Sequence, residues 1–316
     1  MKLSLVVPCY NEEGNVRRFF DTVNTVFCGK LEDYEFVFVD DGSRDSTRKI
    51  LKELYFSDEN TGKIQLVSFS RNFGKEAAIY AGLSKAKGEL ICVIDADLQQ
   101  RPEVVLEMLD KMNGDGDIDC VAAYQQERKE GKGVSFAKSA FYGIINRLAD
   151  VPFVNGASDF RLMKKSVADA VLQMKEYHRF SKGMFSYVGF NTEYIPYTVC
   201  ERESGESKWS TGKLIKYAFE GIFAFSTKLL KLPKILGLLF ILLSLGDFIF
   251  LAVQRLVLSE ALLRLVIILG HIFLVGGSVL LSLGIMGEYL AKMYEQGKDR
   301  PVYIVKEYLD NDKNGN

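Results

Sequence analysis

The chain has 316 residues, a formal net charge of −1 at pH 7 and 48% hydrophobic residues. This balance is ordinary for a globular chain of one or two domains, and without a basic excess no nucleic-acid partner is expected. The five cysteines form no C-x-x-C pair, which fits a reducing cytosol and provides no metal framework.

Short apolar segments alternate with amphipathic segments in the first part of the chain. The apolar segments predict buried strands at 3–8, 34–40, 64–69, 89–95 and 119–124. Helices are predicted between them: one capped by Asn11, one starting at Asp45 or Ser46, and two more over 74–85 and 102–112. The alternation predicts an α/β fold, in which a mostly parallel sheet is covered on both faces and binds ligands at the carboxyl ends of its strands.

Carboxylates follow two of these strands. Asp40 and Asp41 end the second strand, Asp95 and Asp97 end the fourth, and "PCYNEEG" follows the first, so these groups should converge on one crevice. A D-x-D at a strand end can hold a divalent cation that bridges the phosphates of a nucleotide. A single such end is often only a turn or a helix cap. Neither G-x-G-x-x-G after a strand nor G-x-x-x-x-G-K-[ST] is present, which disfavours a dinucleotide dehydrogenase and a P-loop.

Two later runs, 235–253 and 265–287, are almost wholly apolar, and each reaches the roughly 20 residues that cross a bilayer core. The basic residues outside them are Lys228, Lys231 and Lys234 before the first run and Lys292, Lys298, Arg300 and Lys306 after the second. Only Arg255 and Arg264 lie in the connecting loop, so both ends are predicted to face the cytoplasm. A buried soluble hairpin is the alternative. The N-terminus lacks the length and cleavage site of a signal peptide.

Two features border or interrupt the apolar runs. The segment 214–233 combines Phe, Tyr and Leu with interspersed Lys, which favours helices lying on the lipid headgroups; an amphipathic core helix is the alternative. Each run also contains one ionisable residue, Asp247 or His271. Because an intramembrane carboxylate is costly, these two are predicted to face each other, unless Asp247 reaches the interface alone.

Several motifs occur in an order that resembles one known family. They are "VVPCYNEEGNV", "FVDDGSRDST", "SRNFGKEAAIYAG", "DADLQQRPE", "SDFRLM", "RESGESKWS" and "GIMGEYLAKMYEQGKDRPVYIV". They are similar to the membrane-anchored polyprenyl-phosphate glycosyltransferases of glycosyltransferase family 2, which include dolichyl-phosphate mannose synthases and bactoprenol glucosyltransferases. The two apolar runs and the "RPVYIV" tail place the chain nearer the latter. The resemblance implies a GT-A fold and an inverting hexosyltransferase that depends on Mg²⁺ or Mn²⁺.

With this resemblance the chain divides into four expected parts. They are a cytoplasmic GT-A domain (1–212), interfacial amphipathic helices (213–233), two transmembrane helices (234–290, at about 235–254 and 265–287) and a cytoplasmic tail (291–316). The implied location is the cell membrane, multi-pass, with the catalytic domain and both termini cytoplasmic. A homo-oligomer is also expected.

The resemblance assigns donor-side roles residue by residue. The nucleoside pocket would comprise Pro8, Tyr10, Asn11, Glu12, Asp40, Asp41 and Ser43. Glu12 would equally suit the first turn of a helix, and Pro8 the end of a strand. Asp97 is the first choice of metal ligand, Asp95 would bind metal or sugar hydroxyls, and Gln99 would complete the metal shell. Arg202 and Lys208 would bind the donor diphosphate, with a solvated basic loop as the alternative.

On the acceptor side the resemblance points to a different set. Asp159 would act as the base or orient the attacking oxygen, although it could instead pair with Arg161 or form a cap. Arg128, Lys138 and Ser139 would bind the acceptor phosphate, since a guanidinium can bind it through two hydrogen bonds; their alternative is solvation at the surface. A strong base is not obligatory, because a phosphate monoester with a second pKa of about 6 is mostly dianionic at neutral pH.

Three functions compete at this point. The first is transfer of one sugar, with UDP-glucose as best choice and UDP-N-acetylglucosamine, UDP-galactose or GDP-mannose open, to polyprenyl (undecaprenyl) phosphate for cell-envelope glycosylation. The second is a processive polysaccharide synthase, which is disfavoured because Q-x-x-R-W is absent and two spans are too few for a channel. The third is a non-catalytic membrane lipid-carrier component.

Overall fold

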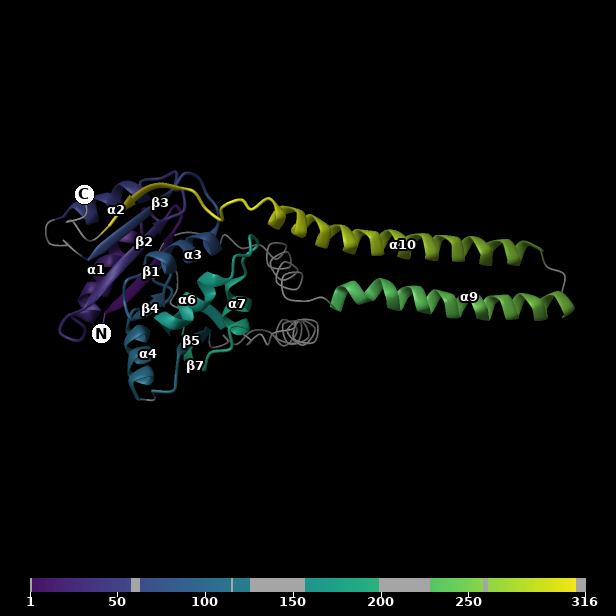
Figure 1. Cartoon of the computed structure of the whole chain (residues 1–316), viewed down its shortest axis with the longest axis horizontal. Helices are drawn as coiled ribbons and strands as arrows, with labels where there is room; N and C mark the ends of the chain where they lie inside the picture. The colour runs from purple at the N-terminus through teal and green to yellow at the C-terminus, as the bar shows by residue number, and fades with distance from the viewer. Residues whose placement is uncertain are drawn as a thin grey trace.

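The computed structural model describes residues 2–57, 63–114, 116–125, 157–198, 228–257 and 261–310. An α/β part is built around an eight-stranded sheet, and two long helices extend from it side by side (Figure 1). The strands are β1 (Leu3–Cys9), β2 (Tyr34–Asp40), β3 (Ile64–Phe69), β4 (Leu90–Val93), β5 (Cys120–Gln125), β6 (Ala157–Lys164), β7 (Thr192–Tyr197) and β8 (Val305–Leu309).

The strands lie in the order β7-β5-β6-β4-β1-β2-β3-β8. Neighbours among β3, β2, β1 and β4 are parallel, as are β5 and β7. β6 runs antiparallel between β4 and β5, and β8 lies antiparallel at the outer edge of β3. All five predicted strands are present, which confirms the α/β class and the mostly parallel sheet. β4 ends at Val93, so Asp95 and Asp97 lie in the turn beyond it.

Helices cover both faces of the sheet. One face packs against α1 (Val16–Phe27), α2 (Thr47–Phe56) and α4 (Glu103–Gly114), and the other against α3 (Lys75–Lys85), α6 (Lys165–Gln173) and α7 (Ser181–Tyr187). Successive side chains of a strand point to opposite faces, so Leu5 and Val7 enter the first core and Val6 the second. Burial on both faces explains the unbroken apolar runs of these strands.

The predicted cap of the first helix was wrong. The N-cap of α1 is Asn15, and Asn11 has a left-handed φ of 53° in the preceding loop, where its side chain contacts the loop after β2 instead. Asparagine adopts this conformation more readily than most residues because its short side chain bonds locally. The N-cap of α2 is Ser46, which is one of the two residues predicted to start this helix.

The apolar runs form α9 (Leu232–Val257) and α10 (Ala261–Gly297), preceded by a 3₁₀ turn at Lys228–Lys231. Leu236 and Phe240 of α9 face Val279 and Leu283 of α10 across an apolar groove. Among the described residues, Gly270–Gly297 is long and apolar enough to cross a membrane, whereas the apolar part of α9, Leu232–Leu243, is shorter. A membrane-spanning pair of helices therefore stays a prediction. So does the Asp247–His271 contact, because the side chain of Asp247 lies outside the described residues.

After α10 the chain returns to the sheet, a feature that the sequence did not predict. β8 pairs with β3, and the ring of Tyr303 stacks on Phe69 with 4.9 Å between ring centroids. The Tyr308 hydroxyl donates to Gln65 Oε1 at 2.7 Å, and Glu307 forms ion pairs with Arg48 and Lys52. The C-terminal segment thus joins the end of the long helix to the edge of the α/β part.

Candidate active site

The loops after β1 and β2 are joined at the carboxyl edge of the sheet. The backbone N–H of Asn11 donates to Ser43 Oγ at 3.0 Å, and Asn11 Oδ1 accepts the backbone N–H of Arg44 at 2.9 Å. The N–H of Glu12 donates to Thr47 Oγ1 at 2.7 Å. The structure therefore brings together two groups that the sequence placed in one nucleoside pocket. Pro8, the last-but-one residue of β1, and Tyr10 beyond it are both half-buried.

Asp40 ends β2 and is only 1% exposed. Its Oδ1 accepts the backbone N–H of Ser43 at 3.0 Å, whereas its Oδ2 is buried and has no hydrogen-bond partner among the described residues. A buried carboxylate oxygen without a donor is costly, and native structures seldom leave one so. Asp40 therefore offers an acceptor to an N–H or O–H donor of a ligand.

Asp41 has a different surrounding. Its two oxygens accept the backbone N–H groups of Phe73 at 2.6 Å and Gly74 at 2.9 Å, which fixes the loop that leads into α3. Burial raises the pKa of this carboxyl to about 6, against the opposing effect of the two N–H donors. Gly42 is required beside it, because its φ is +63° and a Cβ there would lie 2.3 Å from the backbone carbon of Arg71.

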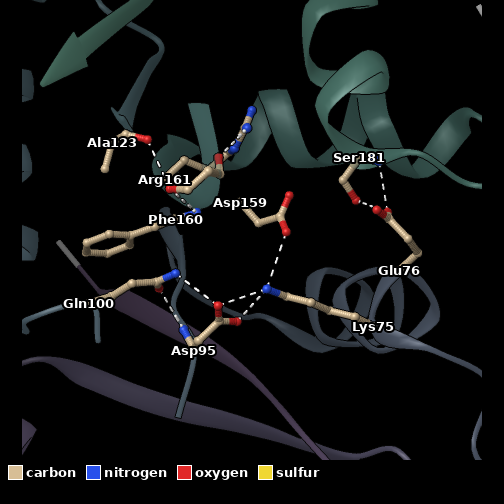
Figure 2. Close-up of polar contacts among 10 residues, drawn as sticks. Lys75, Glu76, Asp95, Gln100, Ala123, Asp159, Phe160, Arg161 and Ser181 are labelled. Atoms are coloured by element: carbon tan, nitrogen blue, oxygen red, sulfur yellow. Dashed lines mark hydrogen bonds and ion pairs between the residues drawn. The ribbon is translucent and has the colours of Figure 1, made fainter. Parts of the chain in front are cut away.

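The D-x-D motif forms the turn after β4. Asp97 Oδ1 accepts the backbone N–H of Gln99 at 3.1 Å, and Leu98 between them has a left-handed φ of 58°. Gln100 binds Asp95 reciprocally: its Oε1 accepts the Asp95 N–H at 2.9 Å and its Nε2 donates to Asp95 Oδ2 at 2.9 Å (Figure 2). The role of Gln100 was not predicted.

Lys75, at the start of α3, lies between two of the predicted carboxylates (Figure 2). Its Nζ is 2.7 Å from Asp95 Oδ1 and 2.9 Å from Asp95 Oδ2, and 3.3 Å from Asp159 Oδ2. Asp159 belongs to β6, the antiparallel neighbour of β4, which explains why residues distant in sequence meet here. Asp159 thus pairs with Lys75, while the guanidinium of Arg161 stacks over Phe185 at 3.9 Å.

The charges of this cluster shift the pKa values of its members. Burial alone would raise the pKa of Asp159, but the nearby Lys75, Lys182 and Arg161 hold it below its ordinary value. The pKa of Lys75 is raised, because the charges of Asp95 and Asp159 outweigh its desolvation. Burial and the charge of Asp159 raise the pKa of Glu76 to about 7, despite its hydrogen bonds from the backbone N–H and hydroxyl of Ser181.

The expected metal would be held by oxygen ligands of the turn after β4. Among the described residues no group of three or more His, Cys, Asp or Glu side chains is arranged to hold a metal ion. Mg²⁺ is commonly held by one or two carboxylates together with substrate phosphates and water, and the oxygens of Asp97 and Gln99 suit that role. Asp95 is already bound to an ammonium group. The residues expected at the two phosphates, Arg128, Lys138, Ser139, Arg202 and Lys208, lie outside the described residues.

The family match and the relatives of this chain are all glycosyltransferases. The model of "Glycosyl transferase family 2" matches residues 4–172. An uncharacterized glycosyltransferase of Synechocystis is 38% identical over 97% of this chain and 95% of its own length. The bactoprenol glucosyl transferase of Shigella phage SfV is 35% identical over 97% of this chain and 98% of its own.

Among solved structures, glucosyl-3-phosphoglycerate synthase from Mycobacterium tuberculosis, in complex with Mn²⁺ and UDP-glucose, is similar over 70% of this chain and 77% of that one, with 16% identity and a TM-score of 0.46. The family match and the two near-full-length relatives carry the assignment: this chain belongs to glycosyltransferase family 2 and is a glycosyltransferase.

Proposed function

We propose that this enzyme transfers one glucosyl group from UDP-glucose to polyprenyl phosphate, with inversion at the anomeric carbon. The observation that carries the proposal is that Asp40, Asp95 and Asp159, from three separate strand ends, lie along one edge of the sheet in a chain that also carries an apolar helical segment, Gly270–Gly297, long enough to cross a membrane. Relatives named bactoprenol glucosyl transferase, similar over nearly the whole chain, support both the sugar and the lipid acceptor.

The donor side uses the loops after β1, β2 and β4. The unpaired Oδ2 of Asp40 would accept a hydrogen bond from the nucleoside, and Tyr10 would pack on the base. Asp97 and Gln99 would hold a divalent cation, which when bound supplies positive charge at the diphosphate. Arg202 and Lys208 would add positive charge to the same group. The sugar would then lie beyond Asp95, towards β6.

The acceptor side uses Asp159 and the phosphate-binding residues Arg128, Lys138 and Ser139. An oxygen of the lipid phosphate forms the new bond to the anomeric carbon while the bond to the nucleoside diphosphate breaks and takes its electron pair, so attack from the opposite face inverts the configuration. Because its pKa is held low, Asp159 is ionised at neutral pH but is a weak base, which favours orientation of the acceptor over removal of its proton.

The two long helices account for the meeting of a soluble donor and a membrane lipid. α9 begins and α10 ends on the α/β side, with α10 reaching closer to the sheet, and both helices extend away from it (Figure 1). In a bilayer this arrangement would keep the catalytic part and both termini on the cytoplasmic face, where nucleotide sugars are dissolved. The cell membrane is therefore part of the proposal, and the homo-oligomer stays a prediction from the resemblance.

A panel of labelled donors tests the proposed function. Purified enzyme is incubated with polyprenyl phosphate, Mg²⁺ or Mn²⁺, and UDP-glucose, UDP-N-acetylglucosamine, UDP-galactose or GDP-mannose. The expected result is one monoglycosylated lipid, formed fastest from UDP-glucose. A faster reaction with another donor would change the sugar and keep the reaction class, whereas no glycosylated lipid from any donor would overturn polyprenyl phosphate as the acceptor.

A further inference from the structure

Lys75 connects two parts of the site that serve different substrates in the proposed reaction. Asp95 belongs to the donor side and Asp159 to the acceptor side, and the Lys75 ammonium contacts both (Figure 2). An ammonium has three N–H donors, and its contacts here are the two oxygens of Asp95 and one oxygen of Asp159. Each of the three N–H groups can therefore be directed at a carboxylate oxygen.

The backbone beside Lys75 is fixed from two directions. On the preceding side, both oxygens of Asp41 hold the N–H groups of Phe73 and Gly74. On the following side, Glu76 Oε2 accepts the backbone N–H of Ser181 at 2.8 Å and also its hydroxyl, which ties α3 to α7. Lys75 itself is 42% exposed, so this support, and not enclosure of its own side chain, keeps the ammonium in place.

The two carboxylates need a cation between them. Asp159 is 14% exposed, and its Oδ1 is buried without a hydrogen-bond partner among the described residues. Two ionised carboxylates close to one cation repel each other once that cation is removed, and the repulsion is strong where water is scarce. Without Lys75, Asp95 and Asp159 would turn apart or one of them would bind a proton.

We propose that Lys75 is a positioning residue, which fixes the donor-side Asp95 and the acceptor-side Asp159 relative to each other and thereby sets the rate of sugar transfer. The inference rests on the proposed function. Lys75 acts through the two carboxylates and takes no part in bond making, so its loss affects turnover more than substrate affinity. Misplacement of reacting groups by about 1 Å can slow a reaction about 100-fold.

The first test separates turnover from binding. Lys75→Met removes the charge and keeps much of the length of the side chain, and Lys75→Arg keeps the charge. We expect Lys75→Met to lower kcat at least about tenfold while KM for each substrate stays within about threefold, and Lys75→Arg to recover part of the loss. Lys111→Met, which breaks an exposed ion pair with Glu193, is the matched control and should behave as wild type. A change in KM alone would overturn the proposal.

A double-mutant cycle tests whether Lys75 acts through Asp159. If it does, Lys75→Met combined with Asp159→Asn should be no more than about threefold slower than Asp159→Asn alone. If instead the two substitutions lowered kcat by independent factors that multiply, Lys75 would not act through Asp159.

The same cycle is measured by thermal unfolding without substrates. Lys75→Met should lower Tm, because it leaves buried Asp159 unpaired, and adding Asp159→Asn should restore part of the loss. If the wild-type enzyme forms no glycosyl lipid, the proposed function fails while this coupling is still measured. If the two substitutions changed Tm additively, Lys75 and Asp159 would not interact, and the proposed role of Lys75 would be wrong.

Discussion

At the residue scale, the carboxylates of the site differ in what their oxygens contact. Asp41 gives both oxygens to backbone N–H groups and so shapes a loop. Asp40 Oδ2 and Asp159 Oδ1 are buried without partners among the described residues. Because burial without a hydrogen bond is unfavourable, we propose that donors of a substrate bind at these two oxygens.

Asp97 is expected to be essential for transfer. Asp97→Asn removes a negative charge from the ligand set proposed for the cation, so kcat should fall at least about 100-fold while Tm changes by no more than about 2 °C. Initial rates across a range of Mg²⁺ and Mn²⁺ concentrations measure the effect, with Asp110→Asn on the exposed face of α4 as control. Near-normal turnover in a folded variant would show that Asp97 is not needed to bind the cation.

Asp159 and Arg128 are expected to act on the lipid side. Asp159→Asn and Arg128→Ala should slow transfer at least about tenfold and leave the dissociation constant of UDP-glucose within about threefold, because the donor is bound by other loops. Calorimetric titration of UDP-glucose and kinetics with varied polyprenyl phosphate give the two quantities. Loss of donor affinity with normal acceptor affinity would mean that the sides are reversed.

Glu76 is expected to make stability depend on pH. Its pKa is raised to about 7 in the folded protein, above the ordinary 4.5, so the folded state holds its proton more tightly than the unfolded state. This contribution to stability is complete below about pH 4.5 and is lost as pH rises through about 7. Glu76→Gln, which keeps an acceptor for Ser181, should therefore gain Tm relative to wild type as pH rises from 5 to 8. A difference independent of pH would contradict the shift.

The sequence predicted Asp40, Asp95 and Asp97 at one edge because strand ends are visible in an apolar pattern. Lys75, Glu76 and Gln100 were missed for a physical reason. A lysine and a glutamate at the start of a helix are typical of a solvated surface, and their partners come from β6 and α7, far away in the chain. Only the tertiary arrangement shows that these charges face the site.

At the scale of elements, the five strands with continuous apolar runs were predicted, and β6, β7 and β8 were not. β7 contains Pro196 and β8 contains Lys306 and Glu307, residues that edge strands tolerate and that break an apolar pattern. β8 gains its strand geometry from β3. Its position therefore depends on tertiary contacts that no local pattern carries.

The C-terminal segment is expected to stabilise the α/β part. Tyr303→Ala removes a ring stacked on Phe69 and in contact with Tyr80, and should cost about 1–3 kcal/mol, seen as a lower Tm in detergent. Ile304→Ala next to it is the control, because that side chain is 52% exposed and should change Tm little. Equal effects of the two substitutions would argue against docking of this segment on the sheet edge.

At the scale of the whole molecule, α10 is tied to the α/β part at two places among the described residues. Besides β8, Gln296 near the end of α10 accepts the N–H of Tyr177 at 2.7 Å and donates to the carbonyl of Lys175 at 3.1 Å, while Glu295 pairs with His178. These contacts reach the segment that leads into α7, whose first residue is hydrogen-bonded to Glu76. α10 is thus joined to the site through packed elements.

The orientation of the chain is open to a direct test. In a variant without its native cysteines, Ser259→Cys, between α9 and α10 in the sequence, should react with an impermeant thiol reagent from outside intact cells. Asn314→Cys near the C-terminus should react only after the membrane is permeabilised, since the basic residues at both ends favour the cytoplasm. Labelling of both positions from the same side would exclude a membrane-spanning pair.

The proposed reaction transfers a single sugar to a lipid phosphate with inversion. The most direct measurement is the mass and anomeric configuration of the lipid formed by the purified enzyme from UDP-glucose, whose own glucosyl bond is α. The expected product carries one added hexose in a β linkage to the phosphate. An α linkage, a polymer of several hexoses, or a product with glucose attached elsewhere than to the lipid phosphate would contradict it.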